Sequence, residues 1–123
     1  MATLADRIFD NGLSALQSEA NRIDACTSEP TTYAEATSTL TLANKTGITV
    51  TGPTDRSGGG REVTIGLISD GSITGTGTAT HFAVTDTANE RLLATQALSS
   101  SLAVVSGDTF IMTEVKIGIP DPT

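Results

Sequence analysis

The stretch TFIMTEVKIGIP, residues 109–120, shows the clearest alternation of apolar and polar side chains in this chain. The residues that share one face of it are Thr113, Val115, Ile117 and Ile119. Glu114 and Lys116 alternate with them on the opposite face. A side-chain period of two is that of a β-strand with one buried face. The stretch therefore predicts a strand that closes the domain and ends at Pro120, which has no N–H to donate to a neighbouring strand.

Segments with the same β character precede this strand and are separated by turn-forming residues. We predict further strands at residues 23–26, 48–51, 63–69, 73–84, 91–98 and 102–105. Asp70-Gly71 and Ser106-Gly107-Asp108 are strong turn signals between them. Strands that recur about every ten residues, with turns between them, are typical of antiparallel folds. The predicted fold is mainly β: an antiparallel β-sandwich or small β-barrel with a short N-terminal helical segment.

The N-terminal segment has helical spacing instead. Leu4, Ile8 and Phe9 fall on one side of a helix. Asn11-Gly12 then supplies a stop signal, and the helical spacing resumes at Leu13, which predicts one broken helix or two short ones. The apolar stripe can pack on the domain or dock on a neighbouring subunit, and the sequence favours neither. The predicted division of the chain is an N-terminal helical arm at 1–21, a β domain at 22–119 and a C-terminal tail at 120–123.

The composition excludes some classes of partner. Seven Lys and Arg against fourteen Asp and Glu leave a net charge of −7. Nucleic-acid affinity comes largely from clustered Lys and Arg, so this balance argues against a nucleic-acid partner. The N-terminal residues contain no long apolar run, so we expect neither a secretory signal nor a membrane span. Few aromatic residues are present, so the core depends on Ile, Leu and Val, and oligomerisation is favoured as a further source of stability.

His81 is the single histidine of the chain and lies in the strand predicted at residues 73–84. Phe82 and Val84 share one face of that strand and are expected in the core. The residues on the opposite face are Ala79, His81 and Ala83. A general base or a metal ligand needs partners, and no ligand spacing surrounds this histidine. We interpret His81 as an inert strand residue and expect no metal and no cofactor.

The common catalytic motifs are also missing from the rest of the sequence. Cys26 is the only cysteine and lacks a recognisable His and Asn framework. The glycines at 58–60 are not followed by the Lys-Ser/Thr of a phosphate-binding loop, and no Gly-x-Ser-x-Gly elbow occurs. A carboxylate pair for glycoside hydrolysis stays open, because a sequence does not reveal the separation of such groups. We predict that the protein is not an enzyme, with no catalytic residue, and keep a small hydrolase as the less favoured alternative.

Three short motifs follow one another in the second half of the chain. They are Thr80-His81-Phe82-Ala83, Leu92-Leu93-Ala94-Thr95 and Ser106-Gly107-Asp108-Thr109. Together with the helical lead and the segment RIDACTSEPTTYAEA, their order resembles that of small virion proteins of tailed bacteriophages. The resemblance covers most of the chain, and positions 53–61 match it least. It implies a virion component of the head-decoration, head-fibre or tail-fibre type, and it implies no catalytic residue.

Among these roles we expect capsid decoration. The protein would be made in the host cytoplasm, bind the exterior of the head and bridge neighbouring copies of the major capsid protein. By resemblance it would form a homotrimer, with no nucleic-acid or membrane partner. A tail or head fibre, or a host-recognition module, is the alternative. The residues predicted at the partner interface are Leu4, Ile8, Phe9, Arg56, Arg61, Ile119 and Pro120.

Overall fold

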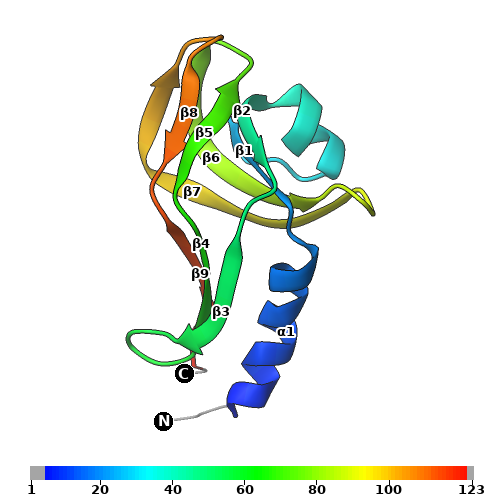
Figure 1. The fold of residues 1–123 in the computed structure, drawn as a ribbon, viewed down its shortest axis with the longest axis vertical. Coiled ribbons are helices and arrows are strands. Elements are labelled where there is room, and N and C mark those ends of the chain that lie inside the picture. The colour runs from blue at the N-terminus through cyan, green and yellow to red at the C-terminus, as the bar shows by residue number, and fades with distance from the viewer. Residues whose placement is uncertain (1–4, 122–123) are drawn as a thin grey trace.

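The protein is mainly β, with antiparallel strands and a helix near the N-terminus, as the sequence predicted (Figure 1). The computed structural model describes residues 5–121. Its elements in chain order are α1 (Asp6–Glu19), β1 (Arg22–Cys26), the π-helical turn η1 (Glu35–Thr39), β2 (Thr41–Thr46), β3 (Val50–Asp55), β4 (Arg61–Ile65), β5 (Ile68–Ile73), β6 (Gly77–Asp86), β7 (Arg91–Val104), β8 (Thr109–Met112) and β9 (Val115–Ile119).

The strands form two sheets. The larger sheet has six strands in the order β7-β6-β1-β2-β5-β8 and is curled, and the smaller has three strands in the order β3-β4-β9. Figure 1 shows the larger sheet in the upper part of the molecule and the smaller sheet below it, beside α1. The curled sheet does not close, because its end strands β7 and β8 pair with one neighbour each.

Three chain segments run through both sheets. β2 continues into β3, β4 into β5, and β8 into β9, so the order β2-β5-β8 above matches β3-β4-β9 below. Ile65 pairs with Val115 in the small sheet, and Ile68 pairs with Met112 in the large one. The same register therefore continues on both sides of a short interruption. The two sheets share one three-stranded ribbon, which the other strands extend in the upper part only.

Two predictions about this ribbon were wrong. The strand predicted at the end of the chain is interrupted, since β8 ends at Met112 and β9 begins at Val115. The turn predicted at Asp70-Gly71 lies inside β5, and the chain changes sheet at residues 66–67 instead. A β-carbon on Gly71 would lie 2.8 Å from Cδ2 of Phe110. This glycine is needed because a phenyl ring packs on it, not because the chain turns there.

The sequence predicted two strands, at residues 91–98 and 102–105, with a break at the serines between them. This prediction is only partly correct. β7 runs without interruption from Arg91 to Val104, but its register against β6 shifts there. Ala79 pairs with Leu102 and His81 with Ala97, so residues 98–101 face Thr80 alone. The alternation of β6 is also broken near this bulge. Ala79 and Phe82 both lie in the main core, whereas the sequence placed them on opposite faces.

Three other local features differ from the sequence predictions. α1 continues through Asn11-Gly12 without a break, since Gly12 is tolerated in a helix that buries Leu13 and Leu16. Residues 41–46 form β2, where a loop was expected, and pair with β1 and β5. η1 was not predicted either. β1 was predicted correctly from its change of period.

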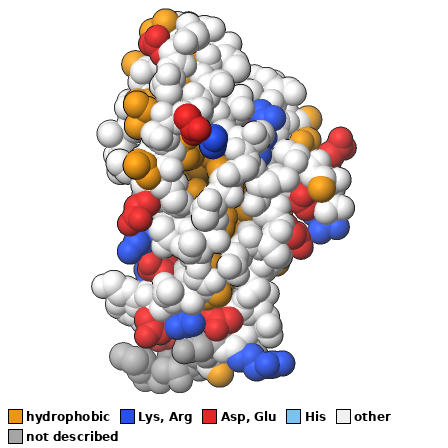
Figure 2. Space-filling model, viewed as in Figure 1, with side chains coloured by type: hydrophobic (Ala, Val, Ile, Leu, Met, Phe, Trp, Pro, Cys, Tyr) orange, Lys and Arg blue, Asp and Glu red, His pale blue; other side chains and the backbone are white. Residues whose placement is uncertain are grey.

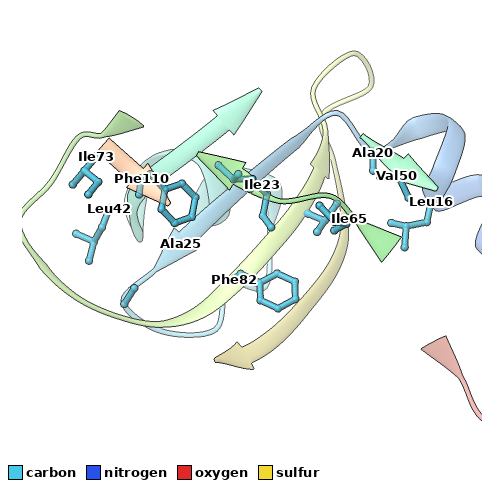
Figure 3. Packing of buried hydrophobic residues seen from close by; sticks show 14 of the residues in the cluster. Leu16, Ala20, Ile23, Ala25, Leu42, Val50, Ile65, Ile73, Phe82 and Phe110 are labelled. Carbon is cyan, nitrogen blue, oxygen red and sulfur yellow. The ribbon is translucent and has the colours of Figure 1, made fainter. Parts of the chain in front are cut away.

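The core extends from the helix to the top of the curled sheet. Figure 3 shows Leu16 of α1 beside Val50, then Ile65 and Ile23, with Phe110 at the far end. Ile23 and Val63 are fully buried. The predicted arm thus packs on β3 and β4 and contributes to the same core as the strands. The core is mostly aliphatic, as the composition indicated, with Phe82 and Phe110 as its buried aromatic residues.

Candidate functional site

His81 lies on β6 with few polar neighbours. Its Nδ1 atom is 2.9 Å from the hydroxyl of Thr80, which also donates to the carbonyl of Thr27 at 2.8 Å. The nearest carboxylate, that of Glu29, is 4.0 Å from Nε2 and largely exposed. A hydroxyl that already donates to a carbonyl accepts from the imidazole, so Nδ1 carries the proton in this arrangement. The contacts tie β6 to the segment after β1.

Cys26 pairs with His81 across the strands, but its thiol is buried and bonds to the carbonyl of Ala36 at 3.6 Å. Burial, with the nearby Asp24 carboxylate as a lesser cause, raises the pKa of this thiol to about 12. A thiol that stays protonated is a poor nucleophile and a poor metal ligand. Cys26 is therefore not activated by its position opposite His81.

Asp24 is fully buried and is the most enclosed charge among the described residues. Arg22 binds it through two hydrogen bonds of 2.7 and 2.9 Å, and Thr41 donates a third of 2.7 Å. Arg22 also reaches the carbonyl of Thr37 in η1 at 3.3 Å. All three of these hydrogen bonds to the carboxylate come from side chains of this chain, so the cluster links β1, β2 and η1.

The predicted interface residues Arg56, Ile119 and Pro120 all lie at the lower end of the molecule, although Arg56 is far from the other two in sequence. The Arg56 side chain packs on Gly118, where a β-carbon would lie 2.9 Å from its Cδ atom. A β-carbon on Gly60 would collide with the carbonyl of Ile119. Ile119 is 38% exposed and Pro120 is also exposed. We call these three residues the end surface.

Arg61, the first residue of β4, has a different role. It donates to Asp10 of α1 at 2.9 Å, to Asp55 at 2.7 Å and to the carbonyl of Pro53 at 3.2 Å. Its side chain is only 17% exposed. Arg61 thus joins the helix to the β3–β4 hairpin, and these bonds orient its guanidinium toward this chain. The sequence could not show this, because Asp10 is distant along the chain.

The side chains of the other three predicted interface residues lie outside the described part of the structure. Leu4 lies outside the described residues. Ile8 and Phe9 fall within α1, but their side chains lie outside the described part of the structure. Their role stays a prediction.

A second surface, which the sequence reasoning missed, lies between the open edges of the curled sheet. Leu102 at the end of β7, Val105 in the following turn and Ile111 on β8 surround one hollow of about 240 Å³. They are 37%, 55% and 62% exposed. We call these three residues the apolar edge. Figure 2 shows hydrophobic side chains along the upper left of the molecule, where Figure 1 places β7 and β8.

A larger groove of about 370 Å³ continues from this hollow, between β7 and the junction of β8 with β9. Phe82 and Met112 lie at its apolar wall, and Ser99, Ser100 and Ser101 of the β7 bulge line its rim. The signal in the sequence was the charge pattern, since residues 92–107 contain no Asp, Glu, Lys or Arg. An uncharged strand is typical of a covered one, yet β7 is a sheet edge.

Within residues 5–121, no group of three or more His, Cys, Asp or Glu side chains is placed to hold a metal ion. No helix in the same range is long and apolar enough to cross a membrane. Comparison with known protein families, with curated proteins and with solved structures finds no match to this chain.

Proposed function

We propose that the protein is a structural component of a tailed-bacteriophage virion, and specifically a capsid decoration protein. It binds the outside of the head and bridges neighbouring copies of the major capsid protein. The order of motifs in the sequence, which resembles that of small virion proteins, is the basis for the virion role. The fold also supports a binding role, because most of its exposed large hydrophobic residues lie at the end surface and at the apolar edge.

The observation that carries the proposal is the end surface. Arg56 comes from the β3–β4 loop, Ile119 is the last residue of β9 and Pro120 follows it, and the pairing of β4 with β9 brings the loop beside them. An exposed isoleucine and proline beside an arginine form an anchor with a polar rim, the arrangement found in protein interfaces. Arg56 donates to the carbonyl of Gly59 at 3.0 Å, which orients its guanidinium at this surface. The end surface would contact the capsid.

The direct test adds purified protein to capsids that lack decoration and measures bound protein against its concentration. We expect saturable binding and greater resistance of the particles to heat. Ile119→Glu should weaken binding at least about tenfold, because it places a charge in an apolar contact. Leu67→Glu is the matched control, since Leu67 is 67% exposed but lies away from the end surface, at the junction of β4 and β5.

Two results would reject the decoration role. Absence of binding at every concentration removes it outright. Binding to susceptible cells or to their surface glycans, with normal capsid stability when the protein is depleted, would assign the protein to the fibre or host-recognition class instead.

A further inference from the structure

The apolar edge is not used by the proposed contact with the capsid. Three of the five large hydrophobic residues that are exposed in the described part of the chain belong to it. The other two, Leu67 and Ile119, lie elsewhere in the fold. Exposed hydrophobic residues are unremarkable singly, but a cluster around one hollow marks a binding surface. The cluster here lies between two sheet edges with unpaired backbone groups.

Sheet edges in soluble proteins are usually protected against other strands by charged residues or proline. β9 follows this rule, since Glu114 precedes it, Lys116 lies within it and Pro120 follows it. β8 contains no charged residue and no proline, and neither does β7 after Arg91. The bulge at residues 98–101 shifts the register of β7 against β6, but residues 102–104 beyond it are again paired regularly with β6. The upper edge is therefore unprotected beside the apolar edge.

We infer that the apolar edge binds a second copy of this chain. The charge distribution selects this occupant. At a net charge of −7, two copies repel each other over most of their surfaces. Asp108 is the single charged residue between Leu92 and Thr113. Two copies that meet through their apolar edges bury hydrophobic area without placing clusters of like charge against each other, and no complementary basic partner is required.

The turn that carries Val105 is held firmly enough to present this surface. The N–H of Gly107 donates to the carbonyl of Ile73 at 2.9 Å, and the N–H of Ser106 donates to the hydroxyl of Thr76 at 3.0 Å. The N–H of Ile73 donates back to the carbonyl of Asp108 at 3.2 Å. These bonds direct the turn toward the β5–β6 connection and leave β7 and β8 apart. A second copy meets a preformed surface, which lowers the entropy lost on binding.

This inference goes beyond the proposed function and does not depend on it, since self-association is measured without capsids. The experiment determines the molar mass of the full chain in solution, by sedimentation equilibrium, over concentrations up to about 1 mM. We expect a reversible oligomer. Ile111→Lys and, separately, Val105→Lys should weaken self-association at least about tenfold. Leu67→Lys, a substitution of an equally exposed hydrophobic residue, should leave it unchanged.

Each outcome decides the inference. A wild-type chain that stays monomeric up to about 1 mM overturns it, and so does an oligomer that Ile111→Lys and Val105→Lys leave intact, or one that Leu67→Lys weakens equally. Circular dichroism checks that the variants fold, which their exposed positions favour. Capsid binding separates the two proposals. Binding retained by a folded Ile111→Lys variant leaves the decoration role standing even if the apolar edge fails. A wild-type chain that binds no capsid but forms an oligomer that Ile111→Lys weakens leaves the apolar edge standing and rejects the decoration role.

Discussion

The upper and lower parts of the molecule share three continuous strands but are stabilised in different ways. In the lower part α1 covers the small sheet, and Arg61 ties the helix to the β3–β4 hairpin through Asp10 and Asp55. Figure 2 shows charged side chains of both signs there. The upper part is a curled sheet with an apolar core and an edge without charges. The same three-stranded ribbon thus carries a lower end whose charged side chains bond to one another and an upper edge that is apolar and open.

The difference shows that two edge strands of one chain segment can present different surface chemistry. β9 and β8 follow one register and each lies at the edge of its sheet, yet β9 contains Lys116 whereas β8 contains no charged residue. Lys116 lies 3.4 Å from the carboxylate of Glu62 on β4, and β8 presents the exposed Ile111 instead. Substitutions that act on one part only are the best way to test this division.

The largest effect is expected from Phe110→Ala in the upper part. Phe110 is 1% exposed and packs on Gly71, so its removal leaves a cavity that the sheet cannot refill. We expect the free energy of unfolding to fall by about 3–5 kcal/mol. Urea denaturation measures it, at low protein concentration so that self-association does not contribute. Ile111→Ala, one residue further along β8 and 62% exposed, is the control and should change it by about 0.5 kcal/mol or less. Equal losses for both would contradict a core centred on the curled sheet.

A smaller loss is expected from Arg61→Ala in the lower part. The change removes hydrogen bonds to two carboxylates and one carbonyl, but Asp55 is largely exposed and that bond is weakened by water. We expect the free energy of unfolding to fall by about 1–2 kcal/mol. Arg56→Ala should cost about 0.5 kcal/mol or less, because within the described residues this arginine donates to the backbone carbonyls of Ser57 and Gly59 and to no carboxylate.

Hydrogen exchange adds spatial information to this second comparison. In Arg61→Ala, faster exchange should appear in α1 and the β3–β4 hairpin, while β1 and β6 keep their protection. Uniformly faster exchange would mean that the two parts unfold together and that the division between them is not energetic.

The smallest effect concerns Cys26 on the outer side of the curled sheet, where η1 covers it. Its folded-state pKa of about 12 lies above that of an unfolded thiol, about 8.5. Folding thus favours the protonated form, and this contribution to stability is complete below pH 8.5 and is lost as the pH rises toward 12. The free energy of unfolding should fall faster between pH 8.5 and 10 in the wild type than in Cys26→Ala. A thiol reagent at pH 8 should label the folded protein far more slowly than the protein in urea, and rapid labelling of the folded form would contradict the burial.

Much of the fold was predictable because it depends on local pattern. The period of two at residues 115–119 and the change of period at β1 identify strands wherever these segments pack. The change of sheet at residues 66–67 was not predictable, because Asp70-Gly71 carries the stronger turn signal. Only the packing of Phe110 on Gly71 explains that glycine. Of the predicted interface, Arg56 is far from Ile119 and Pro120 in sequence, and their proximity depends on pairing between β4 and β9.

The amino-acid sequence by itself determined the mainly β class, the antiparallel arrangement of strands and an aliphatic core. These properties follow from side-chain alternation and composition, which are local and additive. Tertiary structure alone decided that two sheets share one ribbon, that Arg61 bonds to Asp10, and that the uncharged residues 92–104 of β7 lie at an open edge. The physical reason is that a strand carries hydrogen-bonding groups on both sides, and only the packing of distant segments decides which of them find a partner.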